Sequence, residues 1–286
     1  MQVYLDGRWI SHDRAVISPF NSAALYGETV FEAVPLYGGK PLFFEDHLKR
    51  MSRGCRFLGW RSPSQKEVMG ILNRFAVQWG GKGNFLVRLG LVQEMGPKAG
   101  PKSFNGQRPV LFANTRPLRH DPSAVVPACG NVGVAHWRLP SPFSYPFGFK
   151  TAFYLTARRE MLKHPGWDEM LRLSAEGDVA DGFSSTPILI QGKRIFASPV
   201  ESGGLKSVTQ EHVLQHCRKR GFQIARKGWR PADIFRRKSE LIFVGSGVGI
   251  FAAKSLQGKF LLAPGPVTVD LWNEYQKWIK VCSEGK

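Results

Sequence analysis

The chain has 286 residues, of which 43% are hydrophobic and 22% are charged; these ordinary values exclude a chain that is disordered throughout. This length predicts two compact domains or one large one. Lys and Arg outnumber Asp and Glu by 40 to 22, and the resulting net charge of +18 fits nucleic acid, an anionic ligand or a merely basic surface. Because the cations form short scattered clusters and no basic tail, we do not expect nucleic acid to be the partner.

The cysteines and the N-terminus indicate the compartment. Four cysteines lie far apart and form no CxxC pair, which is typical of free thiols in a reducing compartment. The first residues resemble a short strand and turn and lack the basic start and apolar stretch of a signal peptide. Because no apolar run approaches the roughly 20 residues that span a bilayer, we expect a soluble cytoplasmic protein without a membrane partner.

The first part of the chain alternates between strand-like and helix-like patterns. Residues 30–37 and 41–44 flank Gly38-Gly39 and predict a hairpin. Apolar residues at helical spacing follow from residue 45, and the capping box at 64–67 opens a second helix. Further strands are expected at 84–93 and 109–116.

The apolar pattern lapses after residue 117, where Pro122 and Pro127 predict an inter-domain linker at 119–130. Strands followed by helices, twice over, predict two α+β or α/β domains, at 1–118 and 131–286. The later elements are expected as a strand at 132–139, a helix at 151–162, hairpins at 168–180 and 186–198, a helix from Thr209 and a last helix at 269–282.

Two other patterns resemble known binding sites. The glycine-rich segment 245–249 has the composition of a dinucleotide-binding loop, but that loop must follow a strand and open a helix. The residues that follow are strand-like, so we reject it. His212 and His216 are one helical turn apart and could share a metal ion. Because neighbouring cations would repel the ion, we expect a solvated helix face and no metal site.

Lys150 lies in a more apolar setting than the other lysines, between Phe149 and the segment Thr151-Ala152-Phe153-Tyr154-Leu155. Burial disfavours the ammonium form and so favours an amine that can form an imine with a carbonyl. The alternative is a lysine whose stem packs on aromatic rings while its head reaches water. The apolar setting by itself favours this structural alternative.

Seven short segments, each weakly specific, occur in a set order and spacing over most of the chain. They are 25–32 (LYGETVFE), 45–50 (EDHLKR), 149–155 (FKTAFYL), 168–171 (DEML), 177–182 (GDVADG), 202–209 (SGGLKSVT) and 240–246 (ELIFVGS). Together they resemble the class IV aminotransferases, the fold type IV group of pyridoxal-phosphate enzymes, which includes branched-chain and D-amino-acid aminotransferases and aminodeoxychorismate lyase. The resemblance implies a two-domain α+β/α/β fold like that of D-amino-acid aminotransferase, with pyridoxal 5'-phosphate as cofactor.

The resemblance also implies roles for individual residues. Lys150 corresponds to the catalytic lysine, which holds the cofactor as a Schiff base and moves a proton between the substrate Cα and the cofactor C4′. The remaining residues implied for the cofactor are Arg50 for the phosphate, Tyr154 for the phenolic oxygen, Leu205 for a ring face, Ser207, Val208 and Thr209 at a helix start, and Ser246 and Gly247 in a turn near the phosphate and the substrate carboxylate. A helix start suits an anion, although Ser207 and Gln210 also fit a capping box with a purely structural role.

Asp181 stands where the family normally has a glutamate that binds the pyridine nitrogen. A carboxylate there keeps the nitrogen protonated, so that the ring can act as an electron sink. Aspartate is one methylene shorter, and we expect it to take the same role through a slightly shifted ring or a water molecule.

The resemblance implies a homodimer that moves an amino group between an amino acid and a 2-oxo acid in two half-reactions, a ping-pong scheme. Tyr26 and Phe31 fall where the family lines its substrate pocket, and Arg88, Lys98 and Lys102 are candidate partners for a carboxylate. Ala33 replaces a threonine that matters in the lyase branch, which argues against lyase chemistry. The alternatives are an aminodeoxychorismate lyase, a homologue without turnover and a basic nucleic-acid-binding protein; the amino acid and its enantiomer stay open.

Overall fold

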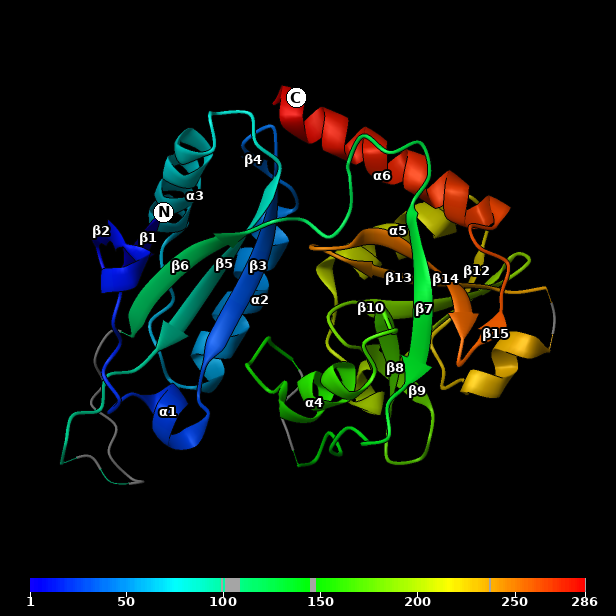
Figure 1. Ribbon diagram of the computed structural model, residues 1–286, viewed down its shortest axis with the longest axis horizontal. Helices are drawn as coiled ribbons and strands as arrows, with labels where there is room; N and C mark the ends of the chain where they lie inside the picture. The colour runs from blue at the N-terminus through cyan, green and yellow to red at the C-terminus, as the bar shows by residue number, and fades with distance from the viewer. Residues whose placement is uncertain (99, 101–108, 145–147, 237, 286) are drawn as a thin grey trace. The chain divides into compact units, whose positions relative to one another are not determined.

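The computed structural model describes residues 1–98, 100, 109–144, 148–236 and 238–285. The chain divides into two compact units (Figure 1). Unit 1 consists of Met1–Leu118, Gly148–Phe153 and Val281–Lys286, and unit 2 consists of Arg119–Phe147 and Tyr154–Lys280. Each unit is built around a sheet of its own.

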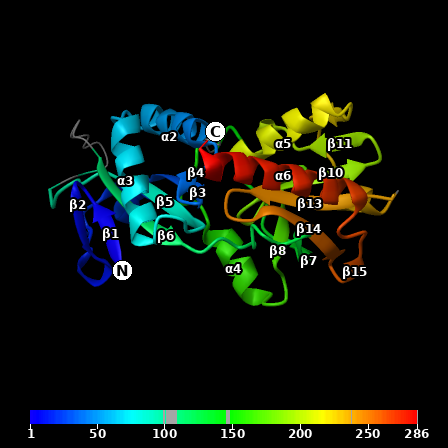
Figure 2. The ribbon, with the colours of Figure 1, turned by 90° about the horizontal axis from the view of Figure 1, so that it is seen from above.

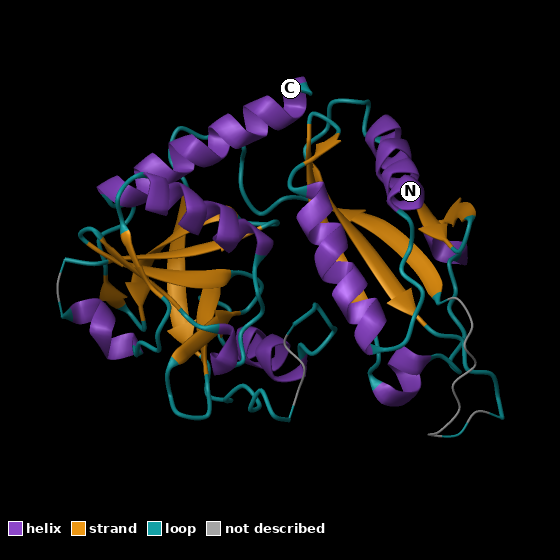
Figure 3. Ribbon diagram, turned by 180° about the vertical axis from the view of Figure 1, so that it is seen from behind, coloured by secondary structure: helices purple, strands orange, loops and turns teal. Residues whose placement is uncertain are grey.

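The described strands of unit 1 form one antiparallel sheet in the order β2-β1-β6-β5-β3-β4. Its strands are β1 Gln2–Leu5, β2 Arg8–Ser11, β3 Val30–Tyr37, β4 Lys40–Pro41, β5 Phe85–Val92 and β6 Val110–Arg116. Its helices are α1 Ser22–Tyr26, α2 Phe44–Phe57 and α3 Gln65–Gln78. Apolar residues of α2 and α3 share one core with Val34, Phe85 and other residues of the sheet, so both helices cover the same face (Figures 2 and 3).

The hairpin predicted near residue 38 is confirmed as β3–β4. Gly38 and Gly39 lie at φ of 55° and 75°, where a side chain would be strained. The second strand ends at Pro41 because α2 already begins at Phe44. It is therefore shorter than predicted.

The described strands of unit 2 form a mixed sheet in the order β12-β11-β10-β13-β14-β7-β8-β9, and β15 pairs with β14. The strands are β7 Ala128–Val134, β8 Glu169–Leu173, β9 Val179–Gly182, β10 Thr186–Gln191, β11 Arg194–Ala197, β12 Gln223–Ala225, β13 Glu240–Gly245, β14 Gly249–Leu256 and β15 Lys259–Phe260. The helices are α4 Leu155–Lys163, α5 Val208–Lys219 and α6 Pro266–Glu284, and α6 enters unit 1 from Val281.

Several predictions for unit 2 are confirmed. The two hairpins are β8–β9 and β10–β11, and both pairs are antiparallel. The glycine-rich segment 245–249 is the turn between β13 and β14, so it opens no helix. The last helix starts earlier than predicted because the Glu240 carboxylate accepts hydrogen bonds from the N–H groups of Val267 and Thr268. That distant side chain satisfies donors that a helix start leaves open.

Two predicted starting points need correction. The strand β7 begins at Ala128, four residues early, where Gly130 and Gly133 weaken the apolar pattern. At Gly133 a Cβ would collide with the Trp167 ring, so the strand needs glycine there. The helix α4 begins at Leu155 because the residues before Tyr154 pack in unit 1.

The predicted solvated face at His212 and His216 is wrong because α6 covers it. Both rings lie 6.2 Å from the Trp278 ring, and His216 Nδ1 lies 3.6 Å from Glu274 Oε1. Within the described residues, no group of three His, Cys, Asp or Glu side chains is arranged to hold a metal ion. Nor does any described helix combine the length and apolar character that crossing a membrane requires.

Candidate active site

A short segment of unit 1 carries Lys150 along the edge of β3. The Phe31 N–H donates to the Lys150 carbonyl oxygen at 3.0 Å, and Arg53 Nε donates to the Gly148 carbonyl oxygen at 3.3 Å. Phe149 lies in the core beneath α2 together with Val30. Successive side chains of a strand point to opposite faces, so Phe31 of β3 lies opposite the core residue Val30. Because its amine lies against the Phe31 ring, Lys150 lies on the face that α2 and α3 leave uncovered.

Phe31 brings two predicted cations together on that face. Lys150 Nζ lies 5.1 Å from the centre of the Phe31 ring, and Arg88 Cζ lies 4.2 Å from it. Phe31 is buried, whereas Lys150 and Arg88 are half-buried. Two cations beside one aromatic ring favour an anion such as a carboxylate. Tyr26, another predicted substrate residue, is 43% exposed at the end of α1. Lys102, an alternative partner for a carboxylate, lies outside the described residues.

Arg50 lies in α2 and is bound by a buried carboxylate of β3. Its Nε lies 2.6 Å from Glu32 Oε1 and its Nη2 lies 2.8 Å from Glu32 Oε2. On the same carboxylate, His47 Nδ1 lies 2.8 Å from Glu32 Oε2. The three side chains are almost completely buried.

The charges in this cluster follow from its contacts. Burial favours the neutral acid, but the Arg50 guanidinium outweighs it and holds the pKa of Glu32 well below its ordinary value. Burial lowers the pKa of His47 despite its hydrogen bond to Glu32. His47 is therefore neutral, and its Nδ1–H donates to a carboxylate that can only accept. The sequence reasoning missed Glu32 and His47, although a glutamate inside the apolar run of β3 was a usable signal.

In unit 2, Asp181 of β9 is brought to Leu205. Asp181 Oδ2 accepts a hydrogen bond from the Leu205 N–H at 3.2 Å, and Oδ1 accepts one from the Gly182 N–H at 3.0 Å. A Cβ at Gly204 would collide with the Ala180 carbonyl oxygen, so the close approach requires glycine. Asp181 and Leu205, which were both predicted to contact the ring of the cofactor, thus lie side by side.

Ser207 forms the N-cap of α5, and its Oγ accepts a hydrogen bond from the Gln210 N–H at 3.3 Å. The hydrogen bond expected from Ser207 in a capping box is therefore present. Val208 and Thr209 follow in the first turn of the helix. The N–H groups of a first turn have no partner inside the helix, and together with the helix dipole they suit an anion.

The turn that holds Ser246 and Gly247 is fixed by a residue that the sequence reasoning missed. The Arg119 N–H donates to the Gly247 carbonyl oxygen at 2.7 Å, and its guanidinium donates to Ser184 Oγ at 2.7 Å. Arg119 lies where the sequence has no apolar period, so no pattern pointed to it. Tyr154 is the N-cap residue of α4, half-buried, with its ring 6.2 Å from the Phe183 ring.

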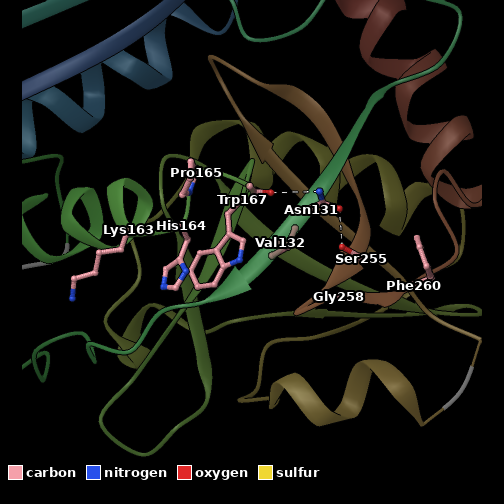
Figure 4. A pocket seen from close by; sticks show the side chains of 10 residues that line it. Asn131, Val132, Lys163, His164, Pro165, Trp167, Ser255, Gly258 and Phe260 are labelled. Atoms are coloured by element: carbon pink, nitrogen blue, oxygen red, sulfur yellow. Dashed lines mark hydrogen bonds between the residues drawn. The ribbon is translucent and has the colours of Figure 1, made fainter.

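A hollow of about 480 Å³ lies elsewhere in unit 2, and it contains none of these residues. Figure 4 shows the side chains that line it, among them Trp167, which stacks on His164 at 3.9 Å. Two of its polar side chains bind each other, since Ser255 Oγ donates to Asn131 Oδ1 at 2.9 Å. We therefore assign it no part in the reaction.

Unit 1 thus supplies an amine on an aromatic ring, and unit 2 supplies a carboxylate held by backbone N–H groups and a buried helix start. Residues 29–256 match the family model of the amino-transferase class IV proteins. The chain belongs to the class IV aminotransferase family.

Known proteins agree with this assignment. A putative branched-chain-amino-acid aminotransferase of Methanocaldococcus jannaschii is 23% identical over 99% of this chain and 100% of its own length. An aminodeoxychorismate lyase of Bacillus subtilis is 26% identical over 78% of this chain and 75% of its own length. The solved branched-chain aminotransferase of Thermoproteus uzoniensis, with norvaline, has a TM-score of 0.83 at 21% identity and covers 98% of this chain and 95% of that chain.

The structural likeness confirms the predicted fold type IV architecture. Class IV aminotransferases use pyridoxal phosphate. A second solved branched-chain aminotransferase, with a TM-score of 0.83 at 18% identity over 97% of this chain and 93% of that chain, is complexed with N-(5'-phosphopyridoxyl)-L-glutamate. This chain is accordingly a pyridoxal-phosphate-dependent transaminase. The two units contain side chains whose chemistry suits this cofactor: an amine that can react with an aldehyde, a carboxylate that can bind a ring nitrogen, and a guanidinium and a helix start that suit a phosphate.

Proposed function

We propose that Lys150 is the residue that attaches the cofactor and that the enzyme moves the amino group of an aliphatic amino acid to a 2-oxo acid. The observation that carries the proposal is the position of Lys150, whose segment is bonded to β3 and whose amine lies on Phe31 beside Arg88. This position is half-buried, so the amine is shielded yet reachable.

Pyridoxal phosphate, when bound, supplies an electron sink for the pair released at the substrate Cα. Lys150 acts as the nucleophile and later as the base that moves a proton at its Nζ. The Asp181 carboxylate binds the ring nitrogen, Leu205 covers a ring face, and the Tyr154 hydroxyl donates to the phenolic oxygen. The phosphate is held by Arg50, by Ser207, Val208 and Thr209 at the start of α5, and by Ser246 and Gly247.

For the substrate, we propose that Phe31 and Tyr26 provide apolar surface and that Arg88 binds a carboxylate. Arg88 lies against the Phe31 ring, beside the amine that reacts, so a carboxylate bound there would hold the Cα near Lys150. An aliphatic substrate is supported by the relatives named branched-chain aminotransferases.

A lyase is the second candidate, supported by the Bacillus subtilis relative. The two activities differ in their products. A transaminase releases the 2-oxo acid of its donor and leaves pyridoxamine phosphate, whereas the lyase releases pyruvate from aminodeoxychorismate. Incubation with aminodeoxychorismate, followed by a pyruvate assay, decides between them.

We further propose a cytoplasmic homodimer. Four free cysteines, Cys55, Cys129, Cys217 and Cys282, suit a reducing compartment. Sedimentation equilibrium of the purified enzyme tests the assembly, and a monomer at all protein concentrations would contradict it.

The central test compares Lys150→Ala with Lys49→Ala. Lys49 is an exposed residue of α2 that forms ion pairs with Glu45 and Asp46 of the same helix, so its loss should leave the enzyme yellow and active. We expect Lys150→Ala to remove the near-visible absorbance of the attached cofactor and to lower kcat by at least about 1000-fold. A panel of L- and D-amino acids then identifies the donor by loss of that absorbance in the wild type. An unchanged absorption band in Lys150→Ala would refute the proposal.

A further inference from the structure

The cluster of Glu32, His47 and Arg50 contains a carboxylate at a place where the proposed function requires an anion to bind. A guanidinium has five N–H donors, and Glu32 uses two of them, on Nε and Nη2. A fixed negative charge beside a phosphate-binding arginine lowers its attraction for the phosphate. Its presence therefore needs an explanation other than a stronger attraction.

The geometry supplies that explanation. A bidentate contact to Nε and one Nη fixes the plane of the guanidinium and its rotation about the side chain. The carboxylate is itself fixed, because His47 Nδ1 lies 2.8 Å from Glu32 Oε2. The side chains of His47 and Glu32 are each 1% exposed, so water does not compete for the hydrogen bond between them.

We propose that Glu32 and His47 are positioning residues, in which Glu32 is the resident counter-ion that holds Arg50 in place for the cofactor phosphate and His47 orients the carboxylate. This inference rests on the proposed role of Arg50. In the enzyme without cofactor, the buried guanidinium of Arg50 is then already neutralised and aligned by Glu32.

The Glu32 carboxylate and a bound phosphate should therefore act as alternative counter-ions of Arg50. A buried charge that loses its partner destabilises a protein strongly. Without the Glu32 charge, the phosphate becomes the main counter-ion of Arg50, so phosphate should stabilise the folded protein more than it does in the wild type. A carboxylate that served only to pack the core would leave the phosphate response unchanged.

The test measures thermal unfolding of cofactor-free protein with and without inorganic phosphate, and then with pyridoxal phosphate. Glu32→Gln keeps the size and removes the charge. Without phosphate, we expect its midpoint to fall by about 10 °C. We expect the upward shift caused by phosphate to be about twofold larger than in the wild type. The double variant Glu32→Gln/Arg50→Gln removes both partners, so it should regain stability and respond to phosphate less than the wild type does.

His47 supplies a matched pair of variants. The amide nitrogen of His47→Asn can replace Nδ1 as donor to Glu32, whereas His47→Ala cannot. We expect the asparagine to retain the wild-type phosphate response and affinity for pyridoxal phosphate, and the alanine to weaken that affinity about tenfold. If Glu32→Gln does not fold without phosphate, this pair carries the test.

The outcomes distinguish the role of Arg50 from the roles of its two neighbours. A phosphate shift that Arg50→Gln leaves at its wild-type size would show that Arg50 does not bind the phosphate, and the proposed role of Arg50 would fail. A shift that Arg50→Gln reduces but Glu32→Gln leaves at its wild-type size would overturn the positioning inference alone. Equal cofactor affinity in His47→Ala and His47→Asn would remove His47 from it.

Discussion

Phe149 and Lys150 are neighbours in the chain, yet one is buried beneath α2 and the other lies beside Phe31 on the opposite face. Gly54 of α2 makes this possible, because a Cβ there would lie 2.8 Å from the Phe149 ring and 2.8 Å from a Val30 methyl group. A residue without a side chain thus sets the place of the lysine that we propose to react.

The charge of the Asp181 carboxylate can be tested by substitution. Asp181→Asn retains the shape of the side chain, but a neutral amide cannot keep the ring nitrogen protonated. We expect kcat to fall about 100-fold while the protein still binds the cofactor. Asp181→Glu retains the charge and should stay within about tenfold of the wild type. Single-turnover rates with the best amino donor measure both, and a fully active Asp181→Asn would show that the carboxylate does not serve the ring.

The helices α3 and α5 begin in the same way. Ser64 accepts a hydrogen bond from the Glu67 N–H at 3.1 Å, and Ser207 accepts one from the Gln210 N–H at 3.3 Å. Their hydroxyl groups therefore contribute similarly to helix stability. Only α5 is proposed to hold an anion at its start.

This similarity provides a matched comparison. Ser64→Ala and Ser207→Ala should each lower the free energy of unfolding by about 1 kcal/mol. Only Ser207→Ala should also weaken the binding of pyridoxal phosphate, because the first turn of α5 loses its fixed geometry. Urea unfolding and a cofactor titration measure the two effects. Equal cofactor affinity in both variants would argue that Ser207 serves the helix alone.

Elements set by local chemistry were predictable from the sequence. The glycine pair of the β3–β4 turn and both serine caps depend on residues within a few positions of one another. The start of α6 was not predictable, since it depends on Glu240, and neither was the start of α4, since residues 148–153 leave the unit that contains the helix.

The candidate site divides in the same way. Lys150, Asp181 and the start of α5 were found because ordered motifs resemble a known family. The role of Arg119 could not be predicted, because its contacts with Gly247 and Ser184 join segments that are distant in the sequence. A single sequence carries no signal for such a contact.

Across the whole molecule, each unit buries a histidine whose pKa burial lowers. His47 lies in unit 1, where burial and the positive charges of Arg50 and Lys150 lower its pKa more than Glu32 raises it. His120 lies in unit 2, with Nδ1 3.3 Å from the Gly247 carbonyl oxygen and its ring 5.8 Å from Trp272. Both are neutral in the folded protein at neutral pH.

The stability of the protein should therefore fall as the pH falls below about 6.5, the ordinary pKa of histidine. Below this pH the two histidines bind protons in the unfolded chain but not in the folded protein, because their pKa values are lower in the folded protein. Each histidine can contribute up to about 1.4 kcal/mol per pH unit until the pH reaches its folded pKa. Urea midpoints at about pH 7.5 and pH 5.5 should differ in the wild type and differ less in His47→Asn/His120→Asn. A variant as acid-sensitive as the wild type would contradict this prediction.

The chain passes between the units four times, at residues 118–119, 147–148, 153–154 and 280–281. The units are therefore compact without being modular. A cut after Leu118 would separate Lys150 from Phe31 and would also remove the C-terminal residues, of which Cys282 Sγ lies 3.5 Å from the Lys40 carbonyl oxygen. Recombination that exchanged one contiguous half of this gene for that of a relative would thus join Lys150 to a foreign strand edge. Functional chimaeras that keep each unit whole should therefore require four crossover points, one at each passage.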